Sequence, residues 1–376
     1  MHTYFFQLGT TSKLSFAELV SVVDEQSLEK ITDQIISLET KDDLDVQELQ
    51  NRLGGCVKIL QSLTVLLAVT PRDIAEAIAV HAAEGRINFA FGEFNRGEED
   101  KIDAGEIKKE LVLLGRSARF VDGNRSGISA AVLLHQHKVQ EFIVVTTPSS
   151  SYLTRTVAVQ NIDDWTVRDR KKPYADRKKG MLPPKVARML LNINRSFDES
   201  EKRVVLDPFC GSGNILLENA VLDDAGVGID LDKNSVTGTI DNLRWFSETY
   251  QKPHNQQVHL GDATHVPEQV SHIITAIVTE PFLGRPKPKP EQVPDIFRGL
   301  EKLYLGAFKN WKTFLPNGAP VTIVFPHTTV KDVEFNMDHL IDKLLPLGYT
   351  TVSGPLKYSR PDAIVSRSIY TFILKK

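Results

Sequence analysis

A short segment near the middle of the chain combines an acidic residue with two glycines. Val204–Leu206 is apolar, as in a buried strand, and Asp207 follows it directly. The next residues, Pro208-Phe209-Cys210-Gly211-Ser212-Gly213, form a turn whose glycines let the backbone approach a ligand closely. Ile215–Ala220 then has the apolar spacing of a helix. This order of elements predicts a ligand site at the carboxyl edge of a parallel sheet.

Two further aspartates follow later predicted strands. Asp230 ends Gly226–Ile229, where its carboxylate could accept hydrogen bonds from both ribose hydroxyls of an adenosine-containing cofactor. Asp232 competes for this role, one turn position later. Asp262 follows the predicted strand beginning at Val258. A Gly-Asp-Ala turn is common, so Asp262 gains weight only from its order and spacing after Asp230.

The stretch Asp207–Gly213 resembles the first motif of S-adenosylmethionine-dependent methyltransferases. The resemblance implies a class I, Rossmann-like α/β domain of seven strands. A C-terminal antiparallel hairpin, formed by Tyr349–Tyr358 and Ser368–Leu374, completes its sheet. It implies S-adenosylmethionine as cofactor, with Asp262 beside the adenine amino group, and no metal. The implied cofactor-binding residues are Asp207, Pro208, Phe209, Gly211, Ser212, Gly213, Asp230, Asp262 and Ala263. A nucleotide-dependent oxidoreductase is the alternative, disfavoured because the third glycine of the dinucleotide fingerprint is missing.

A fourth predicted strand, beginning at Ile273, ends in Thr279-Glu280-Pro281-Phe282. Methyltransferases that act on exocyclic amines usually carry Asp or Asn, two prolines and an aromatic residue here. Acceptors can turn the nitrogen lone pair toward the methyl group, and the aromatic ring can stack on the base. This chain departs from the pattern, since Thr279 and Glu280 replace the acid or amide and the first proline. We expect Glu280 to supply the acceptor, with impaired catalysis as the alternative.

The whole-chain composition describes an ordinary globular protein of 376 residues with a net charge of −3. A length of this order predicts two domains. Two cysteines are too few for a disulfide framework, and no signal peptide or apolar membrane span is evident. We therefore expect a cytoplasmic enzyme with no membrane partner. A homodimer or an accessory subunit stays open.

The N-terminal half alternates short predicted strands and helices and carries no catalytic constellation. Several segments resemble the N-terminal half of THUMP-type tRNA guanosine-N2 methyltransferases, namely 4–19, 88–94, 117–123, 126–145 and 154–193. The resemblance implies a ferredoxin-like module and a tRNA-binding THUMP module over 1–165. A basic linker is expected over 166–180 and the methyltransferase domain over 181–376.

The segment Arg168–Arg188 is strongly basic. Nine basic residues against two acidic ones leave a local charge of +7. Such a cluster suits contact with a phosphate backbone, although a solvated linker has the same composition. The candidate RNA contacts are Arg168, Arg170, Lys171, Lys172, Arg177, Lys178 and Lys179, together with Arg285 and Lys287, which follow the Thr279-Glu280-Pro281-Phe282 segment.

These observations favour methyl transfer from S-adenosylmethionine to the N2 amine of a tRNA guanosine. Direct attack on the methyl group would need no covalent enzyme intermediate, with Thr279, Glu280, Pro281 and Phe282 as the catalytic residues. The family resemblance indicates position 10 of tRNA. A non-catalytic tRNA-binding protein on the same scaffold, or an amino-methyltransferase of another RNA or DNA base, is the alternative.

Overall fold

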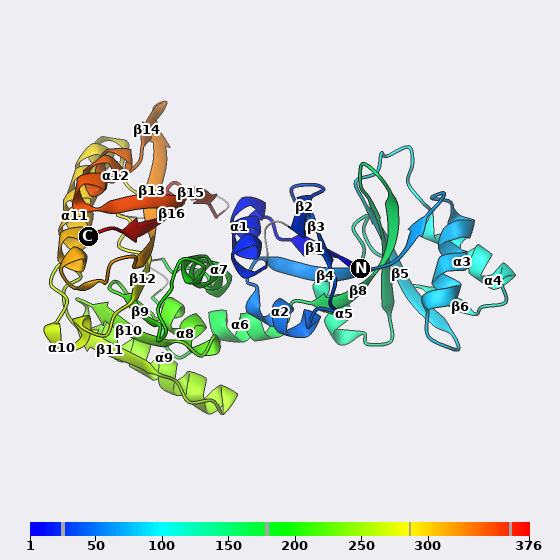
Figure 1. The fold of residues 1–376 in the computed structure, drawn as a ribbon, viewed down its shortest axis with the longest axis horizontal. Helices are drawn as coiled ribbons and strands as arrows, with labels where there is room; N and C mark the ends of the chain where they lie inside the picture. The colour runs from blue at the N-terminus through cyan, green and yellow to red at the C-terminus, as the bar shows by residue number, and fades with distance from the viewer. Residues whose placement is uncertain (24–26, 177–179, 286, 361–362) are drawn as a thin grey trace. The chain divides into compact units, whose positions relative to one another are not determined.

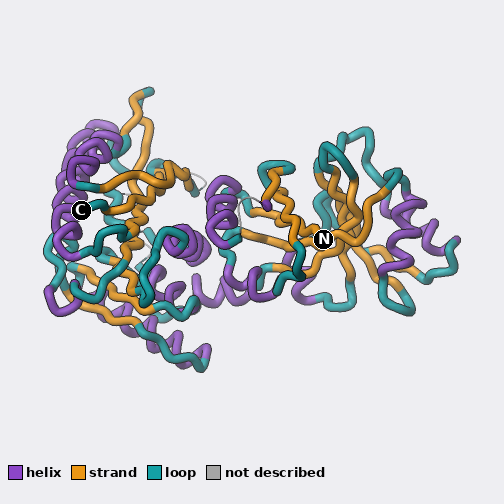
Figure 2. Tube along the Cα trace, in the orientation of Figure 1, coloured by secondary structure: helices purple, strands orange, loops and turns teal. Residues whose placement is uncertain are grey.

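The fold is that of a computed structural model, described here for residues 1–23, 27–176, 180–285, 287–360 and 363–376. The chain divides into two compact units, Met1–Asp164 and Trp165–Lys376 (Figure 1). In each unit, strands form the middle and helices the outside (Figure 2).

The N-terminal unit contains one continuous eight-stranded sheet in the order β2-β3-β1-β4-β8-β7-β5-β6. The strands are β1 His2–Leu8, β2 Leu28–Lys30, β3 Ile35–Thr40, β4 Cys56–Leu66, β5 Ile87–Phe94, β6 Ala118–Phe120, β7 Gln140–Thr146 and β8 Ser151–Val159. The helices are α1 Ser12–Val22, α2 Val46–Arg52, α3 Pro71–His81, α4 Ala104–Leu113 and α5 Ala130–His135. Separate apolar clusters form beside α1 and α2 and beside α3 and α4. The N-terminal unit therefore has two apolar clusters along one continuous sheet.

The second unit contains a sheet in the order β11-β10-β9-β12-β13-β16-β15, and β14 pairs with β13. Its strands are β9 Val204–Asp207, β10 Ala225–Asp230, β11 Gln256–Leu260, β12 Ala276–Thr279, β13 Pro320–Val330, β14 Val333–Phe335, β15 Tyr349–Tyr358 and β16 Ser366–Leu374. The first five strands of this order are parallel, and β16 is antiparallel to β13 and β15. The predicted α/β fold of Rossmann type with a terminal hairpin is confirmed.

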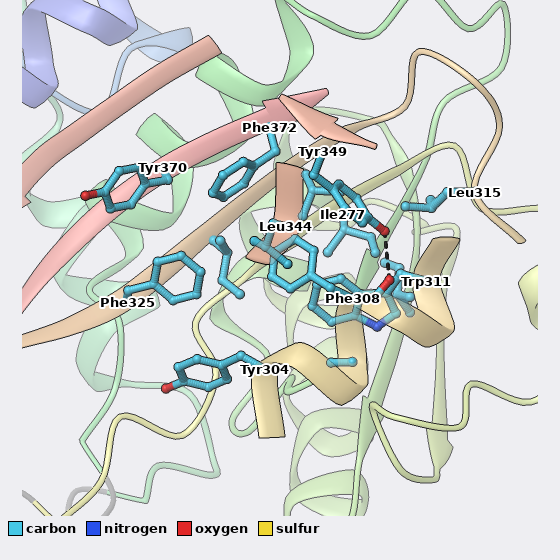
Figure 3. Packing of buried hydrophobic residues seen from close by; sticks show 14 of the residues in the cluster. Ile277, Tyr304, Phe308, Trp311, Leu315, Phe325, Leu344, Tyr349, Tyr370 and Phe372 are labelled. Carbon is cyan, nitrogen blue, oxygen red and sulfur yellow. Dashed lines mark hydrogen bonds between the residues drawn. The ribbon is translucent and has the colours of Figure 1, made fainter. Parts of the chain in front are cut away.

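Two helical layers cover this sheet. The helices are α6 Ile162–Arg170, which begins just before the second unit, α7 Pro184–Arg195, α8 Asn214–Val221, α9 Lys233–Tyr250, α10 Glu268–Ser271, α11 Val293–Phe314 and α12 Asp338–Leu344, with single 3₁₀ turns at Pro290–Gln292 and Leu345–Leu347. The segments α8 and α9 pack in one apolar cluster, whereas α10, α11 and α12 pack against the strands in another. In the second cluster, the Phe308 ring lies 4.8 Å from Trp311 and 4.9 Å from Tyr349, measured between centroids (Figure 3).

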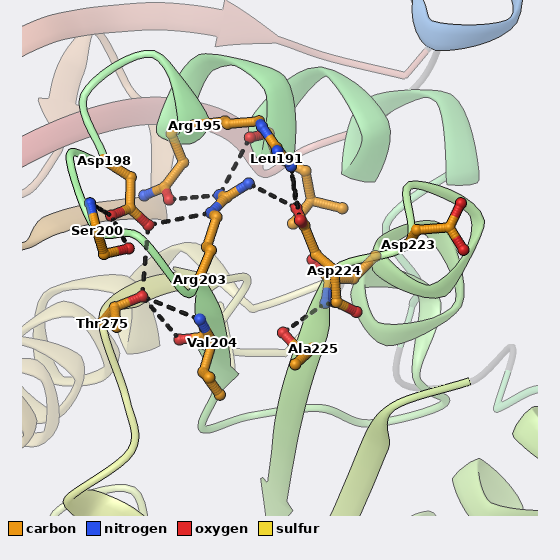
Figure 4. A network of polar contacts seen from close by, with 12 residues as sticks. Leu191, Arg195, Asp198, Ser200, Arg203, Val204, Asp223, Asp224, Ala225 and Thr275 are labelled. Atoms are coloured by element: carbon orange, nitrogen blue, oxygen red, sulfur yellow. Dashed lines mark hydrogen bonds and ion pairs between the residues drawn. The ribbon is translucent and has the colours of Figure 1, made fainter.

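A buried charge network fixes the start of β9 (Figure 4). The Arg203 guanidinium forms ion pairs with Asp198 at 3.2 Å and Asp224 at 3.0 Å. It also donates to Leu191 O, while Thr275 Oγ1 accepts from the Val204 amide at 3.0 Å. These contacts hold α7, β9 and β10 together at the end opposite the glycine turn. The carboxyl end of β9 is thereby placed before any ligand arrives.

Candidate active site

The turn after β9 folds tightly onto β10. The Cys210 amide donates to Ile229 O at 3.0 Å, and the Gly213 amide donates to Cys210 O at 2.7 Å. Gly211 and Gly213 have φ values of 54° and 77°, in the left-handed region that glycine tolerates. A Cβ on Gly213 would lie 2.5 Å from Thr239 Cγ2. Gly213 is thus required by both conformation and space.

Two polar residues of α9 hold this turn, and the sequence analysis missed both. Thr239 Oγ1 donates to Gly211 O at 2.8 Å, and Asn242 Nδ2 donates to Ser212 O at 2.8 Å. Asn242 also exchanges hydrogen bonds with the backbone of Tyr174. Both lie on a helix that sequence periodicity explains by packing alone, so nothing in the local pattern marks them. They make the turn a preformed structure.

Asp230 lies against the glycine turn. Its Oδ2 accepts from the Gly211 amide at 2.8 Å, and its Oδ1 accepts from the Asp232 amide at 2.9 Å. A carboxylate can accept about four hydrogen bonds, so each oxygen retains capacity for a ligand hydroxyl. Asp232 instead caps α9, where its Oδ1 accepts from the Asn234 amide at 3.0 Å. The geometry therefore favours Asp230 over Asp232 for the ribose role.

Asp262 and Ala263 follow β11, and each is held by the chain around it. Asp262 Oδ1 accepts from the amide and the hydroxyl of Thr264, both at 2.8 Å. The carbonyl of buried Ala263 accepts from Trp311 Nε1 at 3.0 Å, which ties this turn to α11. The strand ends at Leu260, and Asp262 follows it after Gly261.

Asp207 and Thr279 meet in the interior, between β9 and β12. Thr279 Oγ1 donates to Asp207 Oδ1 at 2.7 Å, and the side chain of each is buried. Burial raises the pKa of Asp207 to about 7, and the charges of Asp230 and Glu280 also act upward, while hydrogen bonds from Thr279 and the Phe209 amide oppose the shift. Pro208 and Phe209 form the first part of the turn. Thr279 therefore contacts the first acid of the site.

Glu280 forms an ion pair with Arg367 of β16, and Pro281 beside it is buried. Phe282 is 56% exposed, and its backbone carbonyl accepts from Tyr304 of α11 at 2.6 Å. Burial and the Glu280 charge raise the pKa of Tyr304 well above its ordinary value, so it stays a neutral donor. An acceptor and an exposed aromatic ring thus stand two residues apart in the sequence, just after the end of β12. Such a pair can hold an amine and stack on its ring.

The structure divides the predicted basic contacts. Arg168 lies in α6, is 2% exposed and pairs with Glu218, and Lys172 is 5% exposed with its ammonium on Asn214 Oδ1. Burial lowers the pKa of Lys172 to about 8. These two serve packing, so predicting them as phosphate contacts was wrong. The exposed candidates are Arg170, Lys171, Arg285 and Lys287. Arg177, Lys178 and Lys179 lie outside the described residues.

No group of three or more His, Cys, Asp or Glu side chains that could hold a metal ion occurs within the described ranges. None of the helices described is both long and apolar enough to span a bilayer.

Known proteins similar in sequence include methyltransferases. The RMKL-like methyltransferase domain (UPF0020) matches residues 172–303. A probable tRNA (guanine(10)-N2)-dimethyltransferase of Methanothermococcus thermolithotrophicus is 30% identical over 31% of this chain and 70% of that protein. The tRNA (guanine(10)-N2)-dimethyltransferase of Methanothermobacter thermautotrophicus is 29% identical over 46% of this chain and 47% of its own length. The chain thus spans about half of that relative, and about a third of two others.

A solved structure shares the fold. The crystal structure of TrmN from Thermus thermophilus aligns over the full length of both chains with a TM-score of 0.59 at 15% identity. This likeness establishes the fold, and the residues of the site must carry any argument about chemistry.

Proposed function

The chain belongs to the tRNA guanine-N2 methyltransferase family, and from this premise we propose that it transfers a methyl group from S-adenosylmethionine to the N2 amine of a tRNA guanosine. Position 10 is the proposed target, because the relatives named above act there. A tRNA substrate would place the enzyme in the cytoplasm. The observation that carries the proposal is the pairing of a preformed glycine turn with Glu280 and Phe282 on the neighbouring strand.

The turn suits a cationic adenosine cofactor. Cofactor contacts are proposed for Asp207, Pro208, Phe209, Gly211, Ser212, Gly213, Asp230, Asp262 and Ala263. Asp207, Asp230 and Glu280 act electrostatically on one another, because the pKa of Asp207 responds to both of the others. A sulfonium bound at this edge would relieve their repulsion, whereas the anionic pyrophosphate of a dinucleotide would add to it. This charge pattern favours S-adenosylmethionine over a dinucleotide.

The residues of the corner can prepare an amine for attack. When bound, S-adenosylmethionine supplies an electrophilic methyl carbon, whose bond to sulfur breaks as the bond to N2 forms. Glu280 accepts a hydrogen bond from an N2–H and so aims the lone pair; it takes the proton that the methylated amine releases. Phe282 stacks on the extruded guanine. Holding the reacting atoms in line supplies most of the rate.

The tRNA body needs a wider surface. We propose that residues 1–165 form the ferredoxin-like and THUMP region that binds tRNA, and that 181–376 form the methyltransferase domain. Arg170, Lys171, Arg285 and Lys287 are exposed and offer phosphate contacts near the site. Whether a second copy or another subunit joins the complex is left to a measurement of mass in solution.

A non-catalytic tRNA-binding protein is the second candidate. Two observations favour it: Thr279 replaces the expected Asp or Asn, and Arg367 already pairs with Glu280. The two candidates differ in one outcome, which is whether methyl groups reach RNA.

The test is transfer of labelled methyl from S-adenosylmethionine to total tRNA lacking guanine-N2 methylation, followed by nucleoside mass spectrometry. We expect N2-methylguanosine, with or without the N2,N2-dimethyl product. A transcript in which adenosine replaces guanosine 10 is the control and should accept no label. Binding of tRNA without incorporation would support the second candidate, and a different methylated nucleoside would refute the guanine assignment.

A further inference from the structure

The carboxylate at the tip of β12 has a partner from the far end of the sheet. Arg367 Nε donates to Glu280 Oε1, and the two side chains are 10% and 13% exposed. A charge pair at this depth is screened much less than one on the surface. No hydrogen bond to Glu280 Oε2 is found among the residues that the structure describes. Arg367 thus holds one carboxylate oxygen, which leaves the other able to accept a hydrogen bond.

The sheet topology places Arg367 within reach. Strand β16 runs antiparallel to β13, so the start of β16 lies at the carboxyl end of the parallel strands. In that register, Arg367 is paired with Pro326 on β13, and β13 lies between β16 and β12. The arginine side chain must therefore cross β13 to meet Glu280. A long side chain with a rigid planar donor group suits this span.

Neighbouring residues hold Arg367 in place. Its guanidinium carbon lies 5.8 Å from the ring centroid of Tyr358, its neighbour across β15 and β16. Just before it, Ser366 Oγ donates to His327 O at 3.0 Å, and Thr328 Oγ1 donates to Ile364 O at 2.7 Å. These hydrogen bonds connect the start of β16 to the end of β13. Arg367 consequently approaches Glu280 from a defined direction.

We propose, building on the function above, that Arg367 is the positioning residue for Glu280, holding Oε1 so that Oε2 is presented to the substrate amine. A glutamate side chain has three rotatable bonds, and it would otherwise move away from the nearby Asp207 and Asp230. The guanidinium supplies a charge-assisted hydrogen bond that opposes this repulsion. Near-attack geometry tolerates little displacement, so a loose carboxylate would lower kcat more than it changes tRNA binding.

The test is a double-mutant cycle on methyl transfer under single turnover, with Glu280→Gln, Arg367→Gln and the pair combined. Arg367→Gln should lower the rate roughly 30-fold, with tRNA and cofactor affinity unchanged within twofold. In the Glu280→Gln background the same substitution should cost less than about twofold, because the negative charge that pairs with Arg367 is already gone. Arg367→Lys keeps the positive charge but lacks the planar set of guanidinium N–H donors. Its rate should therefore lie between that of Arg367→Gln and that of the wild type.

Folding is checked independently of catalysis. Cofactor affinity and thermal unfolding are measured for every variant, and Arg367→Lys takes the place of Arg367→Gln if the latter does not fold. Arg244→Gln on α9 is the matched control, since Arg244 is 64% exposed and pairs with Asp241 on its own helix. It should leave the rate unchanged.

The outcomes separate the inference from the function on which it rests. A wild-type rate in Arg367→Gln would overturn the positioning role and leave the methyltransferase intact. An equal loss in both backgrounds would also overturn it, because a purely structural effect is additive. A wild-type protein that transfers no methyl group would defeat both. Loss confined to the background that retains Glu280 would support the inference.

Discussion

The glycine turn after β9 and the Thr279–Phe282 corner after β12 end two neighbouring strands of one sheet, yet they are held in different ways. The turn is fixed mainly by Asp230, Thr239 and Asn242, whose hydrogen-bonded partners lie 19, 28 and 30 residues away. The corner depends on Asp207 and Arg367, at separations of 72 and 87 residues. One region is built locally, and the other is assembled from distant parts.

This difference predicts how each region responds to substitutions. The turn is held by hydrogen bonds from residues close by in the sequence, so damage to it should abolish cofactor binding. A corner assembled from side chains can change its chemistry without disturbing the turn. Substitutions should therefore separate binding from catalysis.

The largest effect should come from Glu280→Ala. Removing the acceptor should lower methyl transfer roughly 10³-fold and leave cofactor affinity within twofold, because no hydrogen bond of the glycine turn involves Glu280. Methyl incorporation into tRNA and calorimetric titration with S-adenosylmethionine measure the two quantities. Glu248→Ala, an exposed position on α9, is the control. Substantial activity in Glu280→Ala would remove this residue from the mechanism.

Gly213→Ala should have the opposite signature. Its Cβ would meet Thr239 at 2.5 Å with φ at 77°, so the turn must deform. Cofactor affinity should fall about 100-fold or more, by analogy with losses of about 3 kcal/mol from strain and overpacking. Gly318→Ala carries similar φ strain at 84° with open space around it, and it lies outside the site. That control should bind the cofactor normally; equal losses in the two variants would mean that the clash with Thr239 is irrelevant.

Much of the fold follows from the sequence. Parallel strands in a sheet covered by helices are short apolar runs, and turn residues mark where they end. Val204–Leu206 and Gly226–Ile229 both lie in strands at the predicted places. The ends were less predictable. The strand expected over Ile273–Leu283 spans only Ala276–Thr279, and β8 and β14 were not anticipated. Strand ends and short edge strands are set by pairing partners, which an isolated segment does not reveal.

The same limit applies to the candidate site. Asp230 and the glycines could be named because type and position after a strand are local properties. Thr239, Asn242 and the pairing of Arg367 with Glu280 were not predicted, because each depends on the register between remote elements. The basic cluster misled in part: Arg168 and Lys172 are charged in sequence yet buried against Glu218 and Asn214. Composition cannot tell a solvated charge from a paired one.

Asp207→Asn should reveal what the acid does to stability. Because burial raises the native pKa to about 7 from the ordinary 3.8, the native form binds more protons than the unfolded chain between these values. Wild-type stability attributable to this group is therefore greatest below pH 4 and declines as pH rises to 7. Asparagine does not titrate, so the stability of the variant relative to wild type should grow by about 2 kcal/mol from pH 5 to pH 8.

Urea unfolding measures this change, and tryptophan fluorescence restricts it to the second unit, because Trp165, Trp245 and Trp311 all belong to that unit. Asp241→Asn on α9, whose side chain is 45% exposed, is the matched control. A difference between Asp207→Asn and wild type that stays constant with pH would contradict the raised pKa.

The smallest effect should come from Thr279→Val, which tests whether the unusual threonine serves the turn or the corner. Valine fills the same volume but cannot donate to Asp207 Oδ1, so one hydrogen bond in a fully buried pair is lost. We expect a loss of roughly 1.5 kcal/mol in the free energy of unfolding at pH 8 and a smaller loss at pH 5, where a protonated Asp207 needs no donor. Thr279→Ser keeps the hydroxyl and should retain most of this stability. If both variants methylate tRNA at the wild-type rate, Thr279 belongs to the support of the cofactor side, and the catalytic acceptor at the end of β12 is Glu280 alone.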